Sequence, residues 1–221
     1  PFIMRKALLF AACAAALSAC RGTVPGRNTP AEETISAILI GGRFILPGGE
    51  TRNGLMHVDF ESEGGRSAEV YRLPVSGEER NFLYLVEPGI YRIAPTRSIF
   101  GFHQEQLKVV VDGRTYRLPF PRELLRHPPY EMRASEIMAI GILEARVAPA
   151  LPGQGPQIRV TLDDSVMARR QVVQDTIHDM MDPGRSPEIR ESAISWSRAL
   201  QNSLMAILSE EEKKTPFDPA P

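Results

Sequence analysis

Cysteine is almost absent from this 221-residue chain, which contains only Cys13 and Cys20. Both lie near the amino-terminal end, so no disulfide framework can cross-link the rest of the chain. Lysine is scarce too, because only four of the 26 basic residues are Lys, and 27 acidic residues balance them. This balance leaves no basic excess for nucleic acid, so we expect no nucleic-acid partner.

Motifs that would assign an enzyme class are also missing. No Gly-x-Ser-x-Gly sequence occurs, and Gly41-Gly42 and Gly64-Gly65 lack the Gly-Lys-Ser/Thr ending of a phosphate-binding loop. The chain has four histidines. His57 and Asp59 share one face of an alternating strand, but a metal site would need a third ligand. We interpret that face as exposed and polar, and we predict no catalytic residues, metal or cofactor.

The amino-terminal segment carries the most specific pattern in the chain. A basic start, Met4-Arg5-Lys6, precedes the alanine-rich run Ala7–Ala16, which is too short for a membrane span of about 20 residues. These features are typical of a secretory signal peptide. Its ending, Leu17-Ser18-Ala19-Cys20, resembles the lipobox of bacterial lipoproteins, in which a branched apolar residue and two small residues precede a cysteine. We interpret Met4 as the translation start and residues 1–3 as an upstream artefact.

The resemblance to bacterial lipoproteins implies a defined maturation. The signal peptide, residues 1–19, would be cut between Ala19 and Cys20, the thiol of Cys20 would be diacylated, and the new amino terminus would be acylated. Arg21 follows the cysteine, whereas Asp at that position signals inner-membrane retention in many Gram-negative bacteria. We therefore expect a lipid-anchored protein of the bacterial cell envelope, on the outer membrane and facing the periplasm.

The composition of the chain changes beyond the predicted cleavage site. Residues 20–33 are polar and rich in Gly and Pro, which predicts a flexible tether. Residues 34–163 contain short apolar runs separated by Gly and Pro, a pattern typical of β-strands. We predict a mainly β domain there, an antiparallel β-sandwich. The expected strands span residues 35–46, 55–60, 68–73, 81–86, 90–94, 106–111, 114–120, 137–147 and 158–162.

Glycine positions predict the local backbone. Asp112-Gly113 joins two alternating runs and suits a type I′ hairpin turn, which needs positive φ at both residues. Pro88-Gly89 suits a type II turn, with positive φ at the glycine. Gly41-Gly42 predicts a bulge or a break in the first strand. The stretch Leu83–Ile93 resembles the strand pair of prealbumin-like and carboxypeptidase-regulatory-like β-sandwiches, which implies a sandwich and no activity.

After the last expected strand, the apolar residues recur at the spacing of an α-helix. Asp163 or Asp164 is expected to cap a helix that ends at Met181. Ser186-Pro187 then starts a second helix, whose apolar side chains recur at spacings of three and four and include Trp196.

These two helices, within residues 164–212, are expected to pack on the sandwich, which makes the chain α+β overall. The alternative is that the apolar stripe stays exposed and serves as a docking surface. Residues 213–221 are expected to form a disordered tail.

Two aromatic loops offer a candidate contact surface, since loops carry function more often than cores do. One contains Phe100, Phe102 and His103, and the other contains His127 and Tyr130. The alternative is loop packing, with Phe100 or Phe102 closing an open end of the sandwich.

The sequence therefore predicts a lipid-anchored envelope protein with a non-catalytic binding or structural role. Its expected partners are the membrane, through the lipid on Cys20, and another envelope protein or envelope polymer. The alternative is an envelope hydrolase whose site assembles only in three dimensions. A deep pocket lined by at least three His, Asp or Glu side chains would favour that alternative.

Overall fold

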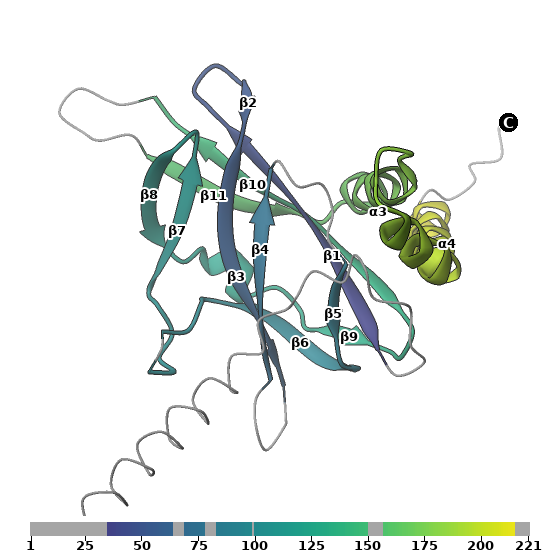
Figure 1. The fold of residues 1–221 in the computed structure, drawn as a ribbon. Helices are drawn as coiled ribbons and strands as arrows, with labels where there is room; N and C mark the ends of the chain where they lie inside the picture. The colour runs from purple at the N-terminus through teal and green to yellow at the C-terminus, as the bar shows by residue number, and fades with distance from the viewer. Residues whose placement is uncertain (1–34, 64–68, 78–82, 99, 150–156, 215–221) are drawn as a thin grey trace, which may run out of the picture.

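The computed structural model of the chain describes residues 35–63, 69–77, 83–98, 100–149 and 157–214. The predicted signal peptide, the tether with Cys20, and residues 215–221 lie outside this range. The described residues form two β-sheets and two long helices in three layers (Figure 1).

The first sheet lies between the second sheet and the helices. Its strand order is β11 (Ile158–Asp163), β10 (Ile137–Val147), β1 (Ser36–Ile45) and β2 (Thr51–Arg52), and β5 (Tyr84–Val86) also pairs with β1. β1 and β10 run parallel, whereas their other pairings are antiparallel. The sheet is therefore mixed, unlike the purely antiparallel arrangement that the sequence predicted.

The second sheet is antiparallel. Its order is β8 (Arg114–Pro119), β7 (Gln106–Val111), β3 (Gly54–Ser62), β6 (Gly89–Ala94) and β9 (Tyr130–Met132), with β4 (Val70–Ser76) on the other side of β3. The long strand β3 pairs with β7 near its start and with β6 near its end. The predicted fold class, a β-sandwich followed by helices, is confirmed.

One of the two predicted turns is present. Asp112 has φ of 49° and Gly113 has φ of 74°, as a type I′ turn requires. The prediction of a type II turn at Pro88-Gly89 is wrong, because Gly89 is not among the residues with positive φ. There β5 pairs with β1 of the first sheet, whereas β6 pairs with β3 of the second. The chain therefore crosses between sheets at this point instead of forming a hairpin.

The predicted break at Gly41-Gly42 is also wrong, since β1 runs unbroken. The bulge lies in β10, where the register shifts and Ile140 has no partner in β1. Gly42 serves close packing instead, because a Cβ there would lie 2.8 Å from the carbonyl oxygen of Ser76. Gly141, next to the bulge, has φ of 127°, and a Cβ there would lie 2.2 Å from the carbonyl oxygen of Asp163.

Two hydrophobic cores hold the layers together. The first fills the space between the sheets and includes Phe44, Phe60 and Tyr84. The short helix α2 (Arg122–Leu125) adds Leu124 to this core. The second lies between the first sheet and the helices, and it contains Leu39 of β1.

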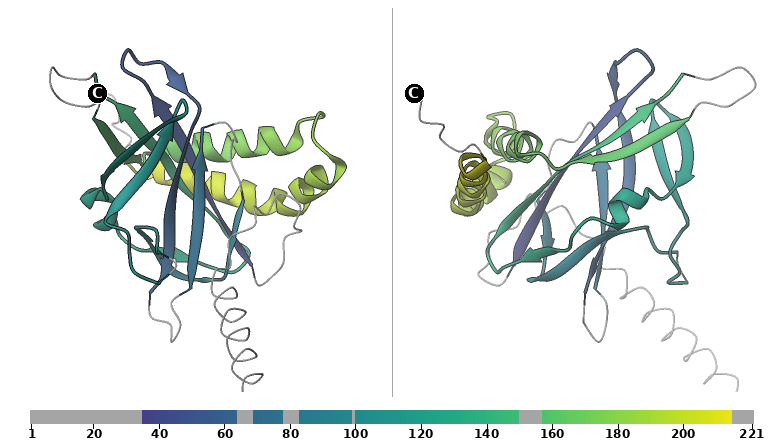
Figure 2. Two further views of the ribbon diagram at one scale, coloured as in Figure 1. Left: turned by 60° about the vertical axis from the view of Figure 1, so that its left-hand side comes forward. Right: turned by 180° about the vertical axis from the view of Figure 1, so that it is seen from behind.

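The helices α3 (Val166–Met181) and α4 (Pro187–Lys214) cover the outer face of the first sheet (Figure 2). Ser165 caps α3 by accepting a hydrogen bond from the Ala168 N–H, so the predicted Asp caps are wrong by one or two positions. α4 ends two residues beyond the predicted boundary. None of the described helices has the length and apolar character needed to cross a bilayer.

Trp196 of α4 is fully buried in the second core. The prediction that the apolar stripe packs on its own domain is therefore confirmed.

Replacing Trp196 by Ala is expected to lower the free energy of unfolding by about 3–5 kcal/mol, since it leaves a large cavity in the second core. Ile194→Ala is the matched control on the same helix, because Ile194 is 67% exposed. Urea unfolding of the full chain measures both. Equal midpoints for Trp196→Ala and the unaltered protein would contradict the packing described here.

Candidate functional site: the buried carboxylates of β3 and the loop they hold

The outer face of the second sheet buries two carboxylates. Met56, Val58 and Phe60 point into the core, so the alternation along β3 places Asp59 and Glu61 on the opposite face. Asp59 is nevertheless 0% exposed and Glu61 2% exposed. The prediction of an exposed polar face is therefore wrong here, because the segment between β6 and β7 folds back over these residues.

Asp59 is bound from two directions. Its Oδ1 accepts a hydrogen bond of 3.0 Å from Nε of Arg72, on the neighbouring strand β4. Its Oδ2 accepts one of 2.8 Å from the backbone N–H of Arg97. The guanidinium of Arg72 also donates to the carbonyl oxygen of Arg97, at 2.7 Å. One carboxylate thus attaches the backbone of the covering segment to the sheet.

Glu61 binds the side chains of the same segment. Nε of Arg97 donates to Oε1 of Glu61 at 2.7 Å, and Nε2 of His103 lies 2.5 Å from the same oxygen. Burial raises the pKa of Glu61, but the hydrogen bonds and charges of Arg97 and His103 outweigh it and hold the pKa below its ordinary value of 4.5. The carboxylate therefore stays ionised at neutral pH, as its partners require.

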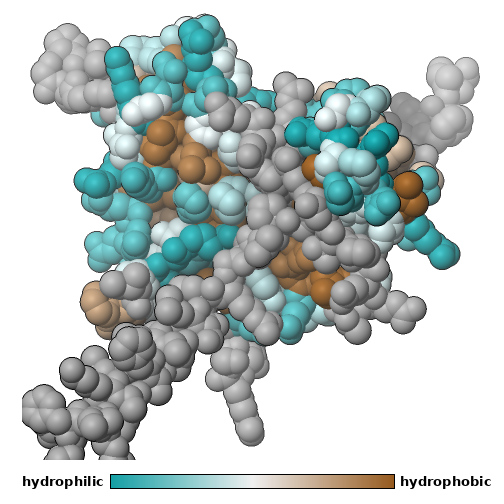
Figure 3. Space-filling model, in the orientation of Figure 1, coloured by the Kyte–Doolittle hydropathy of each residue, from teal (hydrophilic) through white to brown (hydrophobic). Residues whose placement is uncertain are grey.

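The covering segment, residues 95–98 and 100–105, is called the tip loop below. Arg97 and His103 form a β-bridge across it, and the Ser98 N–H donates to the Phe102 carbonyl at 2.8 Å. These bonds hold Phe100 and Phe102 outward, 78% and 75% exposed. The segment projects beside β7 in Figure 1, and Figure 3 shows hydrophobic atoms at that place. The alternative that Phe100 or Phe102 closes an open end of the sandwich is therefore wrong.

His127 and Tyr130 meet elsewhere in the fold. Their rings stack with centroids 4.9 Å apart and an interplanar angle of 9°. Nε2 of His127 lies 3.1 Å from Oδ2 of Asp164. Burial and the nearby Asp164 carboxylate raise the pKa of the Tyr130 hydroxyl, which therefore stays protonated at neutral pH.

The candidate contact surface thus divides into two places. Phe100, Phe102 and His103 belong to the tip loop, whereas His127 and Tyr130 form a cluster with Asp164, and none of the contacts among the described residues joins the two. Sequence reasoning missed Asp59 and Glu61 as ion-pair centres. The alternation of polar residues on β3 was the available signal, but it did not show what would cover them.

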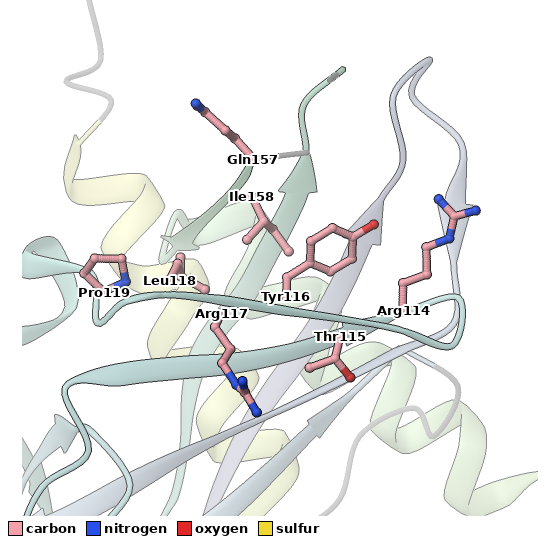
Figure 4. A pocket seen from close by; sticks show the side chains of 8 residues that line it. All are labelled: Arg114, Thr115, Tyr116, Arg117, Leu118, Pro119, Gln157 and Ile158. Atoms are coloured by element: carbon pink, nitrogen blue, oxygen red, sulfur yellow. The ribbon is translucent and has the colours of Figure 1, made fainter. Parts of the chain in front are cut away.

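The hollows of the described surface include the following three. The first, of about 580 Å³, lies between the edge strands β8 and β11, where Tyr116 and Ile158 project toward it and Arg117 points away (Figure 4). The second, of about 420 Å³, lies between β10 and α4 and contains Glu136 and Glu210. The third, of about 440 Å³, adjoins the tip loop.

None of these three hollows collects three His, Asp or Glu side chains, which is the feature that would favour a hydrolase. Among the residues that the structure describes, no group of three His, Cys, Asp or Glu side chains is placed to hold a metal ion.

Comparison with known proteins identifies no relative. No protein-family model matches the chain, and no curated protein and no solved structure matches it significantly.

Glu61→Gln is expected to lower the free energy of unfolding by about 1–3 kcal/mol, because it removes the charge that satisfies the half-buried Arg97 and His103. Glu63→Gln is the matched control: Glu63 is exposed and lies 3.9 Å from Arg92, and such a surface pair contributes little. Chemical denaturation measures both variants. A Glu61→Gln protein as stable as the control would contradict a role for Glu61 in holding the loop.

This contribution of Glu61 should depend on pH. Because its pKa is lower in the folded protein than its ordinary value of 4.5, the stabilisation is complete above that value and is lost as the pH falls through the folded pKa. The difference in unfolding free energy between the unaltered protein and Glu61→Gln should therefore shrink as the pH falls below about 4.5. Urea titrations at several pH values measure this. A difference that does not change with pH would contradict the assignment.

Proposed function

We propose that this chain is a lipid-anchored protein of the bacterial cell envelope, on the outer membrane and facing the periplasm, with a non-catalytic binding role. The order of a basic start, an apolar run and Leu17-Ser18-Ala19-Cys20 supports the anchor. Arg21 supports the outer membrane as the destination.

The tip loop supports binding rather than catalysis. The carboxylates of Asp59 and Glu61 bind Arg72, Arg97 and His103, so these charges fix the loop. What the loop presents to its surroundings is a pair of exposed aromatic rings. Contiguous exposed apolar patches mark contact sites, and the two phenylalanines lie two residues apart on one loop. The observation that carries the proposal is the exposure of Phe100 and Phe102 on a loop held by buried ion pairs.

The anchor is tested by mass spectrometry of the mature amino terminus, which should begin at an acylated Cys20. Acyl chains contribute about 0.8 kcal/mol per buried CH₂, and more than one chain holds a protein stably on a membrane. Cys20→Ser should therefore lose stable attachment through lipid, and Arg21→Asp should move the protein to inner-membrane fractions. An unmodified Cys20 would contradict the proposal.

A further inference from the structure

We propose that the tip loop inserts Phe100 and Phe102 into the surface of an anionic phospholipid membrane, with Lys108 and Arg117 binding the phosphate headgroups beside it. This inference rests on the proposed function, because it assumes a domain held at a membrane by Cys20. It names the partner of the loop as the lipid surface itself.

The two phenylalanines are the most exposed large hydrophobic residues in the described part of the chain. Their exposure is built into the fold. Arg97 and His103 hold the base of the loop on Glu61, and the Gln104 N–H donates to the Thr96 carbonyl at 2.9 Å. A narrow projection with apolar side chains at its end suits the boundary between headgroups and acyl chains, where apolar groups are buried about 5–10 Å deep.

A pair of cations lies at the base of the same loop. Lys108 of β7 is directly opposite Arg117 of β8 in the strand register. Like charges at such positions repel each other, and within the described residues neither side chain forms an ion pair with a carboxylate. A bound anion would relieve this repulsion.

These two cations line the third hollow, of about 440 Å³, together with Gln104, Glu105 and Gln106. Glu105 is the single carboxylate in that lining, so the hollow is cationic and offers amide groups as further hydrogen-bond donors. The phosphate of a lipid headgroup fits this set of charges. The hollow begins two residues beyond Phe102, so both contacts can be made at one membrane surface.

The place of the anchor agrees with this geometry. In Figure 1 the start of β1 and the tip loop both lie toward the lower side of the view, the former at the right and the latter at the left. The chain between Cys20 and Ile35 can span at most about 50 Å. A lipid on Cys20 therefore keeps the loop within reach of the membrane, and contact of the loop with lipid adds a second point of attachment.

The test uses full-length lipidated protein in vesicles of phosphatidylethanolamine and phosphatidylglycerol that contain acyl-brominated lipid, which quenches nearby tryptophan. Phe102→Trp places a reporter on the loop. Ile194→Trp is the control on an exposed face of α4, and the signal of the buried Trp196 is subtracted with the unaltered protein. We expect Phe102→Trp to be quenched at least about twofold more strongly than the control, because only the loop reaches the acyl chains. Phe100→Trp provides a second reporter.

The cations are tested in the same vesicles on the Phe102→Trp background. Lys108→Gln with Arg117→Gln should lower the fraction of inserted loop, with the insertion constant falling about fivefold per cation lost near an anionic surface. Arg190→Gln with Arg198→Gln is the charge-matched control on α4 and should leave quenching unchanged.

Three results would overturn the inference. Acylated protein whose loop reporters are quenched no more than Ile194→Trp would overturn the inference alone, and the loop would then bind a partner other than lipid. Equal effects of the two charge-removing pairs would overturn the headgroup site. An amino terminus without acyl chains would overturn the proposed function, and the inference with it.

Discussion

The parallel pairing of β1 with β10 is the constraint on which the other layers depend. It joins a strand near the start of the folded domain to one about a hundred residues later, and it places both between two cores. Parallel strands of this kind are buried on both faces, and residues 36–40 at the start of β1 are all buried. The sandwich packs on one face of this pair and the helices on the other, so a change in its register would disturb both cores.

The second sheet packs against a core on only one of its faces. Its outer face buries two carboxylates, and burying unpaired charges costs far more free energy than a surface ion pair contributes. Each carboxylate is therefore matched by several donors from β4 and from the tip loop. This pairing makes the loop a fixed part of the sheet while its apolar side chains remain in solvent.

The proposed lipid anchor and the tip loop could together position the domain at the membrane. A lipid on Cys20 with a flexible tether would limit distance from the membrane and leave the orientation of the domain free. A rigid loop that contacts the surface would restrict that orientation. The His127–Tyr130–Asp164 cluster is separate from this arrangement, and the contacts of His127 with the Pro128 carbonyl, Asp164 and Tyr130 pack its loop.

The sequence by itself determined most of the local structure. Short apolar runs marked nine of the strands, Asp112-Gly113 specified its turn, and the spacing of apolar residues around Trp196 marked the buried side of α4. These features depend on neighbouring residues, so they can be interpreted without knowledge of the fold. The short strands β2 and β9 and the helix α2 carry too few residues to form such a pattern.

Only the tertiary structure decided how these elements meet. The separation of β5 from β6, the parallel partner of β1 and the covering of Asp59 and Glu61 all join residues distant in sequence, and no local pattern specifies such contacts. For the same reason the sequence could propose Phe100, Phe102 and His103 together with His127 and Tyr130, yet could not separate them into two places. The exposure of the tip loop also depends on such distant contacts, because the buried carboxylates of β3 hold the loop away from the core.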